Sequence, residues 1–234
     1  MLRGKFFCVF FCTAIITSFT AGAQSVPREV LRGEVSVELE PVYLLHLGIS
    51  SPLDKKTADL WALEDSATAF SGMIYGWIFE YEPGERVREI SEYISLTPLG
   101  RIEMKDDRLR ITNASVENEV LYTWCDYNLS GEQQFRMTAW NAAGTKKIKA
   151  MGFAPLQGKD GVTDRKMVKE AALEDALKKA IRAELRATQK NRPRMVRGYI
   201  ALSEFPLYRI FHGNWAAQAS FRLRVTEIIP YAAY

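Results

Sequence analysis

The sequence predicts an α+β fold: an antiparallel sheet packed with a long alanine-rich amphipathic helix at about 163–189, and shorter helices nearer the N-terminus. Three observations support this prediction. Apolar side chains recur at helical spacing within residues 163–185. Side chains at 215–226 alternate between two rows, one of them apolar, as in a half-buried strand. Strand-like segments precede and follow the helical stretch.

The helix at 163–189 has an apolar face made largely of alanine. Six apolar side chains share this face: Ala172, Leu173, Ala176, Leu177, Ala180 and Ile181. Charged side chains occupy the opposite face, and Thr163 or Asp164 can cap the start. Because alanine side chains are small, the helix axis can approach its support closely, and we expect bulky sheet residues to fill the remaining volume.

Four segments around this helix predict strands: KKIKAMGFAPLQ (146–157), MVRGYIAL (195–202), PLYRIF (206–211) and WAAQASFRLRVTEII (215–229). His212-Gly213-Asn214 is typical of a tight hairpin turn between the last two. One row of the last strand holds Trp215 and Phe221, and the other holds two arginines. We expect the apolar row to face the helix.

The preceding region predicts strands and two further helices. Its expected elements before residue 100 are a strand at 33–41, a helix at 55–70, a strand at 73–82 and a short helix at 84–95. Asp54 can cap the first of these helices. From Arg101 onward, RIEMK, RLRITNASV, EVLYTWCDYNL and EQQFRMTAW predict a meander of antiparallel strands. We expect this meander to continue into the strand at 146–155.

These elements divide the chain into a signal peptide at 1–23, an acidic α+β region at 24–145 and a basic β-α-β-β module at 146–234. The acidic region holds 11 basic and 20 acidic residues, and the basic module holds 18 and 8. This asymmetry favours docking within a chain or association between chains. The two halves can share one sheet.

The N-terminus predicts export from the cytoplasm. Arg3 and Lys5 precede an apolar run at 6–19, and Ala21-Gly22-Ala23 matches the pattern that signal peptidase cuts. The run is shorter than the roughly 20 residues of a membrane-spanning helix, although an uncleaved anchor is an alternative. We therefore expect a periplasmic or secreted protein that is cut after Ala23.

The sequence contains few residues in patterns that indicate catalysis. Its two histidines, His46 and His212, lie far apart and match no zinc-ligand spacing. Phosphate-binding, dinucleotide-binding and nucleophile-elbow fingerprints are absent from the sequence. Cys125 shares a strand face with Leu121 and Tyr127, which indicates a core thiol. We expect a non-enzymatic protein without catalytic residues, metal or cofactor.

Two sets of residues are candidates for binding. A basic cluster is the candidate surface for a protein partner in the envelope or for self-association: Arg186, Lys190, Arg192, Arg194 and Arg197. For an exported protein, an acidic protein surface, lipid headgroups or a glycan are expected rather than nucleic acid. The row of Tyr122, Trp124 and Asp126 is the candidate ligand face, where aromatic rings stack on a sugar.

The C-terminal module resembles an LPP20-type module. The likeness covers about residues 146–229 and rests on Gly152-Phe153-Ala154-Pro155 followed by the alanines of the helix: Ala171, Ala172, Ala176 and Ala180. This type of module also forms the N-terminal domain of a periplasmic flagellar-assembly protein of the H-ring. The resemblance implies a place in the cell envelope and a structural or assembly role, and it implies no catalytic residue. The charged connection at 187–195 departs from the pattern.

We therefore expect a structural or assembly role in the bacterial cell envelope, linked to a flagellar or other periplasmic complex. A periplasmic glycan- or small-ligand-binding module is the alternative. A small outer-membrane barrel is the third reading, because the chain ends IIPYAAY after an alternating strand. Pro230 and the long charged helix count against the barrel.

Overall fold

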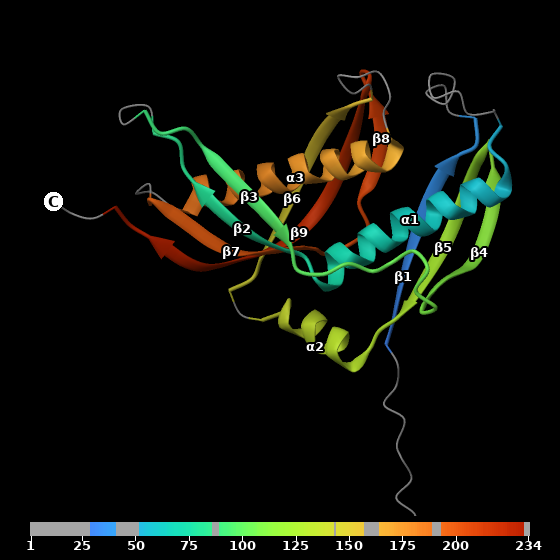
Figure 1. The fold of residues 1–234 in the computed structure, drawn as a ribbon, viewed down its shortest axis with the longest axis horizontal. Coiled ribbons are helices and arrows are strands. Elements are labelled where there is room, and N and C mark those ends of the chain that lie inside the picture. Colours follow the sequence, from blue (N-terminus) through green and yellow to red (C-terminus); the bar gives the residue numbers. More distant parts are fainter. Residues whose placement is uncertain are drawn as a thin grey trace, which may run out of the picture.

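The computed structural model describes residues 29–40, 52–85, 89–142, 144–156, 164–188 and 193–231. These residues form nine strands in two antiparallel sheets and three helices (Figure 1). The strands are β1 (Val30–Glu38), β2 (Trp77–Glu82), β3 (Tyr93–Pro98), β4 (Leu109–Glu117), β5 (Val120–Asn128), β6 (Lys146–Pro155), β7 (Met195–Leu202), β8 (Leu207–Phe211) and β9 (Asn214–Ile229). The helices are α1 (Lys55–Ile74), α2 (Gly131–Ala139) and α3 (Arg165–Thr188).

The predicted fold class is wrong. Strand accounts for 45% of the structure and helix for 30%, so the protein is mostly β-sheet and has two sheets rather than one. One sheet has the order β1-β5-β4. The other has the order β3-β2-β7-β9-β6, with β8 also paired to β9. Alternation along a strand determines which side chains share a face but not which strand pairs with it, and for this reason the second sheet was missed.

Three local predictions fail. The strand expected over RIEMK (101–105) does not form, because these residues are turn and irregular structure before β4. The helix expected at 84–95 does not form, since Tyr93–Pro98 is strand β3, paired with β2. The strand expected over EQQFRMTAW is helix α2. Ser130 and Gln133 form a capping box at its start, a signal that was present in the sequence. The meander therefore ends at β5, and β6 pairs with β9 instead.

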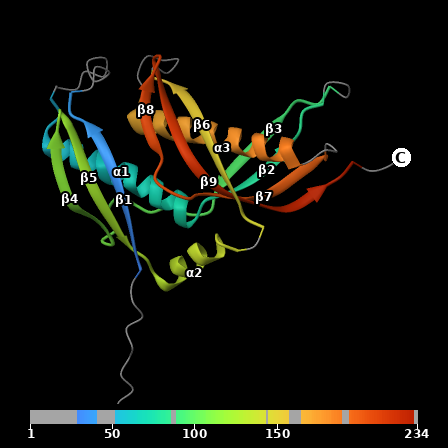
Figure 2. The ribbon, with the colours of Figure 1, turned by 180° about the vertical axis from the view of Figure 1, so that it is seen from behind.

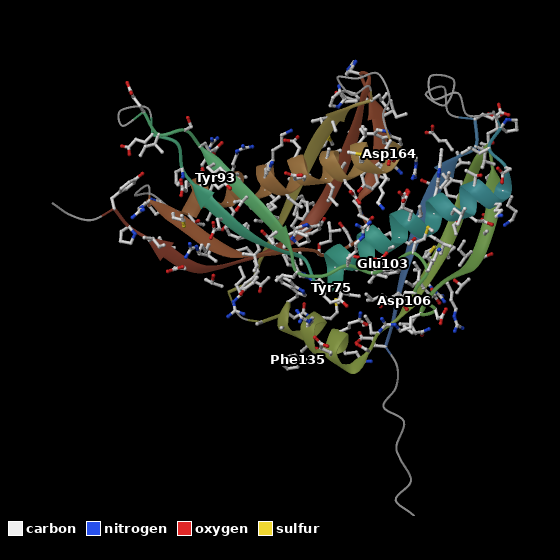
Figure 3. All side chains as sticks on the ribbon, viewed as in Figure 1. Tyr75, Tyr93, Glu103, Asp106, Phe135 and Asp164 are labelled. Atoms are coloured by element: carbon white, nitrogen blue, oxygen red, sulfur yellow. The ribbon has the colours of Figure 1, made fainter. Side chains whose placement is uncertain are left out.

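Other elements confirm their predictions. Helix α1 covers the expected 55–70, and the side chain of Asp54 accepts a hydrogen bond from the Thr57 N–H at 3.0 Å. Strand β7 has the expected bounds, 195–202. Asp164 lies at the start of α3 (Figure 3), where its Oδ1 accepts from the Lys166 N–H at 2.9 Å. Thr163 and the predicted signal peptide lie outside the described residues.

Strands from both predicted halves of the chain pair in the larger sheet. Strand β2, from the acidic region, pairs with β7, from the basic module. None of the described helices is both long enough and apolar enough to cross a membrane.

Helix α1 contacts both sheets, as Figures 1 and 2 show from opposite sides. Its Phe70 ring lies 5.8 Å from the ring of Tyr127 on β5, measured between centroids. At the C-terminal end of the helix, a side chain at Gly72 would meet Leu202 of β7. The core therefore runs through α1 from one sheet to the other.

Helix α2 is held by a network of polar side chains. Gln133 Nε2 donates to the hydroxyl of Tyr75 at 2.7 Å and to that of Tyr127 at 3.0 Å. The Tyr127 hydroxyl donates in turn to Asp106 at 3.1 Å. Hydrogen bonds from Arg108 hold the pKa of Asp106 at about 2, so this carboxylate stays charged across the physiological range. Figure 3 labels Tyr75 and Asp106 in this region.

Helix α3 contacts β6 and β9 through its alanine face, whose Ala172, Ala176 and Ala180 are fully buried. The approach is closest at Gly152 of β6. A Cβ built there would lie 2.1 Å from the backbone N of Ala176 and 2.2 Å from the backbone O of Ala172. The apolar row of β9, including Phe221, is buried, as predicted.

Replacing Gly152 with Val should therefore destabilise the protein. The added atoms would meet backbone, which cannot rotate away, so α3 must move off the sheet at a cost of about 1–3 kcal/mol or more. Urea denaturation measures the loss. Gly131→Ala is the matched control, because a Cβ there has nothing within 4 Å. Equal stability of Gly152→Val and the wild type would contradict this account of the packing.

Candidate functional site

A groove lies between α1, α3 and the β2–β3 hairpin. Its volume is about 510 Å³. Thirteen residues line it: Thr68, Ser71, Gly72, Gly76, Trp77, Leu96, Pro98, Gly100, Arg101, Glu170, Leu173, Glu174 and Leu177. They come from distant parts of the sequence, so only the folded chain brings them together.

The turn from α1 into β2 depends on Gly76. This residue has φ +66°, a left-handed conformation that side chains disfavour, and a Cβ there would lie 2.4 Å from the carbonyl oxygen of Ile200. Glycine therefore allows α1 to end directly against β7, which sets one end of the groove.

The groove has an apolar floor and a charged rim. Trp77 and Leu96 form the floor from the sheet, and Leu173 and Leu177 form it from α3. Arg101 lies at one part of the rim, and Glu170 and Glu174 line the α3 side. Glu174 pairs with Lys178 at 2.6 Å. Within the described residues neither Arg101 nor Glu170 has an ion-pair partner, so both charges are available to a bound molecule.

A buried charge cluster links α1 to α3. Asp65 of α1 accepts hydrogen bonds from Arg165 and Lys169 of α3, and the Lys169 Nζ lies 2.7 Å from Asp65 Oδ2. The three side chains are only 9%, 5% and 6% exposed, in that order. Burying a charge costs free energy unless the charge is paired, and the Asp65 carboxylate accepts hydrogen bonds from both cations.

Aromatic rings surround the two cations. The Arg165 guanidinium lies 4.7 Å from the ring centre of Trp61, and the Lys169 ammonium lies 4.8 Å from those of both Tyr208 and Trp215. Burial lowers the pKa of Lys169 to about 8, although Asp65 opposes this shift. Burial also raises the pKa of Tyr208. The adjoining cavity, along the edge of β1, measures about 90 Å³, which is too small for an organic ligand of ordinary size. We call Asp65, Arg165 and Lys169 the clamp, because their ion pairs join α1 to α3.

The described residues of the predicted basic cluster do not act together, because two of them pair with different acids. Arg197 on β7 pairs with Glu80 at 2.8 Å and with Glu227 at 3.3 Å. Arg186 lies 3.7 Å from Glu92. Arg194 is exposed just before β7. Lys190 and Arg192 lie outside the described residues.

The predicted ligand face lies on the outer side of the smaller sheet. Trp124 is 39% exposed and borders a shallow hollow of about 290 Å³ with Arg32, Thr112 and Asn113. Asp126 accepts two hydrogen bonds from Arg32, each 2.7 Å long, and the pKa of Asp126 is lowered chiefly by them. Tyr122 lies two residues before Trp124 on the same face of β5. This face holds an aromatic ring beside polar groups, but its carboxylate is already paired.

Cys125 confirms the prediction of a core thiol. It is fully buried on the opposite face of β5, and burial raises the pKa of the thiol. Among the described residues, no group of three or more His, Cys, Asp or Glu side chains is arranged to hold a metal ion.

Sequence reasoning missed both the groove and the clamp. A partial signal existed for the clamp, because Trp61 and Asp65, and likewise Arg165 and Lys169, are spaced four residues apart on their helices. The contact itself joins residues about a hundred positions apart, and nothing in either local pattern indicates the other helix.

Replacing Asp65 with Asn should destabilise the protein strongly. The change removes the buried carboxylate that accepts hydrogen bonds from Arg165 and Lys169, and removal of one partner from a buried ion pair costs about 3–5 kcal/mol. Chemical denaturation measures this loss. Glu132→Gln is the control, since it removes an exposed pair with Arg136 worth about 0.2–0.5 kcal/mol. A similar loss in both variants would contradict the clamp.

Replacing Lys169 with Met should change how stability depends on pH. The pKa of Lys169 is about 8 in the folded protein and 10.5 in the unfolded chain, so the unfolded chain binds more protons between these values. The penalty for burying the ammonium is therefore present below pH 8 and is relieved as pH rises. Relative to Lys169→Met, the wild type should gain about 2 kcal/mol of unfolding free energy between about pH 7 and 9.5.

Urea denaturation across this pH range measures the difference. Lys178→Met, on a more exposed position of the same helix, serves as the control and should follow the wild type. Parallel curves for the wild type and Lys169→Met would show that burial does not perturb this amine.

Comparison with known proteins gives a family without an assigned function. A model of an uncharacterised family matches residues 18–231. An uncharacterised protein of Treponema pallidum (strain Nichols) is 27% identical over 173 residues, which cover 73% of this chain and 69% of that relative. No solved structure matches the chain. Because the family model spans far more than half of the sequence, the chain belongs to this uncharacterised family.

Proposed function

We propose that the protein is a non-enzymatic, exported ligand-binding protein of the bacterial cell envelope, and that the groove between α1 and α3 is its binding site. The observation that carries this proposal is the groove itself: about 510 Å³ with an apolar floor and charged residues at the rim. Sites for small molecules commonly measure about 300–1,000 Å³ and combine apolar walls with a few polar groups.

The lining favours an amphipathic ligand. Trp77 and Leu96 are half-buried and offer apolar surface to a hydrocarbon or ring system, whereas Leu173 and Leu177 are already almost fully buried. Burial of the remaining apolar surface would supply most of the affinity. Arg101 and Glu170 can orient a polar end of the same molecule, because each carries a charge without a partner in the described residues. A purely polar ligand would leave these apolar side chains in contact with water.

The lining also supports binding rather than catalysis. Ser71 is one of the two groove residues with a hydroxyl on an aliphatic side chain, and its Oγ is occupied. It donates to the Ala67 carbonyl at 2.6 Å and accepts from the Ile102 N–H at 2.8 Å. No histidine or cysteine is among the described groove residues, and the Ser71 hydroxyl is engaged within the protein both as donor and as acceptor.

The export part of the proposal rests on the charged start, the apolar run and the Ala21-Gly22-Ala23 site. The structural or assembly role implied by the LPP20 resemblance, in a flagellar or other envelope complex, stays a prediction, since no contact of the described residues bears on it.

A substitution that fills the groove should weaken ligand binding. Thr68→Trp on α1 places an indole in the groove, and we expect at least a tenfold weaker affinity for an apolar fluorescent probe such as N-phenylnaphthylamine. Fluorescence titration of the purified protein measures this affinity. Leu60→Trp adds the same indole at an exposed position of the same helix and should bind as the wild type does. Equal binding by both variants, or no binding by the wild type, would overturn the proposal.

A further inference from the structure

A second surface lies on the outer side of β6, β8 and β9, at the end of the larger sheet. Opposite residues of antiparallel strands share a face, so the register shows which side chains belong to it. Met151 and Leu207 flank Gln218, and Phe153 and Arg209 flank Ala216. We call this surface the outer face; its apolar members are Met151, Phe153, Leu207 and Phe211.

The apolar members of the outer face are exposed to solvent. Their exposed fractions are 44% for Met151, 37% for Phe153, 44% for Leu207 and 56% for Phe211. The rings of Phe153 and Phe211 lie 6.5 Å apart, so the aromatic side chains form a continuous patch. Exposed apolar patches of this kind mark interaction surfaces.

The core does not require these side chains. Gly152 and Ala154, which alternate with Met151 and Phe153, are the buried residues of β6, and α3 contacts the strand on their side. Figures 1 and 2 show α3 along β6 and β9. Folding therefore buries the inner row of β6, whereas Met151 and Phe153 of the outer row keep 44% and 37% of their surface exposed.

Cations border the patch. Lys147 and Lys149 continue the outer row of β6, and Arg209 lies beside Phe153 across Ala216; all three are exposed. Lys179 of α3 lies 4.7 Å from the ring centre of Phe153.

Among the described residues, two nearby acids, Glu204 and Asp175, are engaged within the protein. Glu204 accepts a hydrogen bond from the Ser220 hydroxyl. Asp175 pairs with Lys179 at 2.7 Å and accepts from the Phe153 N–H at 2.9 Å. The outer face thus combines exposed aromatic and aliphatic groups with an excess of positive charge.

We propose that the outer face docks the protein on the surface of an anionic lipid bilayer. The apolar side chains would enter the headgroup layer while the lysines and Arg209 lie over anionic headgroups, so the protein stays peripheral. A protein partner fits this chemistry less well, because lysine is depleted at protein interfaces, whereas a negative membrane surface attracts each nearby lysine or arginine. The inference is independent of the ligand proposed for the groove.

Vesicle sedimentation of the full chain tests the proposal. We expect binding to vesicles of phosphatidylcholine with phosphatidylglycerol, weak binding to phosphatidylcholine alone, and release at high salt. Replacing both phenylalanines, Phe153→Ala with Phe211→Ala, should weaken binding at least tenfold. Replacing Lys147 and Lys149 with Gln should weaken it about 25-fold, since each cation near the surface contributes roughly fivefold.

Matched controls separate this face from general adhesion. Phe135→Ala removes a phenyl ring from α2 that is 76% exposed and projects from the molecule (Figure 3). Lys105→Gln removes an exposed cation before β4. Both should bind vesicles as the wild type does. All these side chains are exposed, so circular dichroism should show that every variant stays folded.

Three results would overturn the proposal. The first is no sedimentation with anionic vesicles at low salt. The second is wild-type binding by the variant that lacks both phenylalanines. The third is self-association that depends on Phe153 and Phe211 without lipid and is unaffected by vesicles, which would assign the outer face to a second copy of the chain. Probe binding in the groove, measured in the same variants, reports on the proposed function separately.

Discussion

The ion pairs that Asp65 makes with Arg165 and Lys169 are the interaction on which much of the remaining structure depends. Helix α1 contacts both sheets, and α3 contacts the larger one, so this carboxylate joins two helices that together contact both sheets. Water is largely excluded, and each member therefore needs the others. Removal of one partner costs far more than an exposed pair would. The geometry is correspondingly restrictive, because an ion pair in this environment tolerates little movement.

The groove lies between the same two helices. Its walls include Thr68 and Ser71 of α1, close in sequence to Asp65, and Glu170 and Leu173 of α3, which follow Lys169. The clamp and the groove therefore lie between the same two helices. A groove that is already formed suits a binding site, since it does not have to be ordered when the ligand arrives.

The groove and the outer face use opposite sides of the larger sheet. Strands β2 and β3 contribute Trp77 and Leu96 to the groove on the side that faces α3. The outer row of β6 presents Phe153 and two lysines on the other side. A sheet can serve both purposes because successive side chains point to opposite faces. A protein held at a membrane by one face would keep the groove on the other accessible to a ligand.

The sequence by itself determined the local elements: α1 with its Asp54 cap, strand β7, the buried row of β9 and the core position of Cys125. Each follows from a period or a cap that a few neighbouring residues define. It also contained the capping box of α2, formed by Ser130 and Gln133. Tertiary structure alone decided that β1, β4 and β5 form a separate sheet, that β6 pairs with β9, and that Asp65 meets Lys169. Strand pairing, ion pairs and grooves bring together residues that are distant in the chain. Local periodicity does not determine which distant segment pairs or packs with a given element.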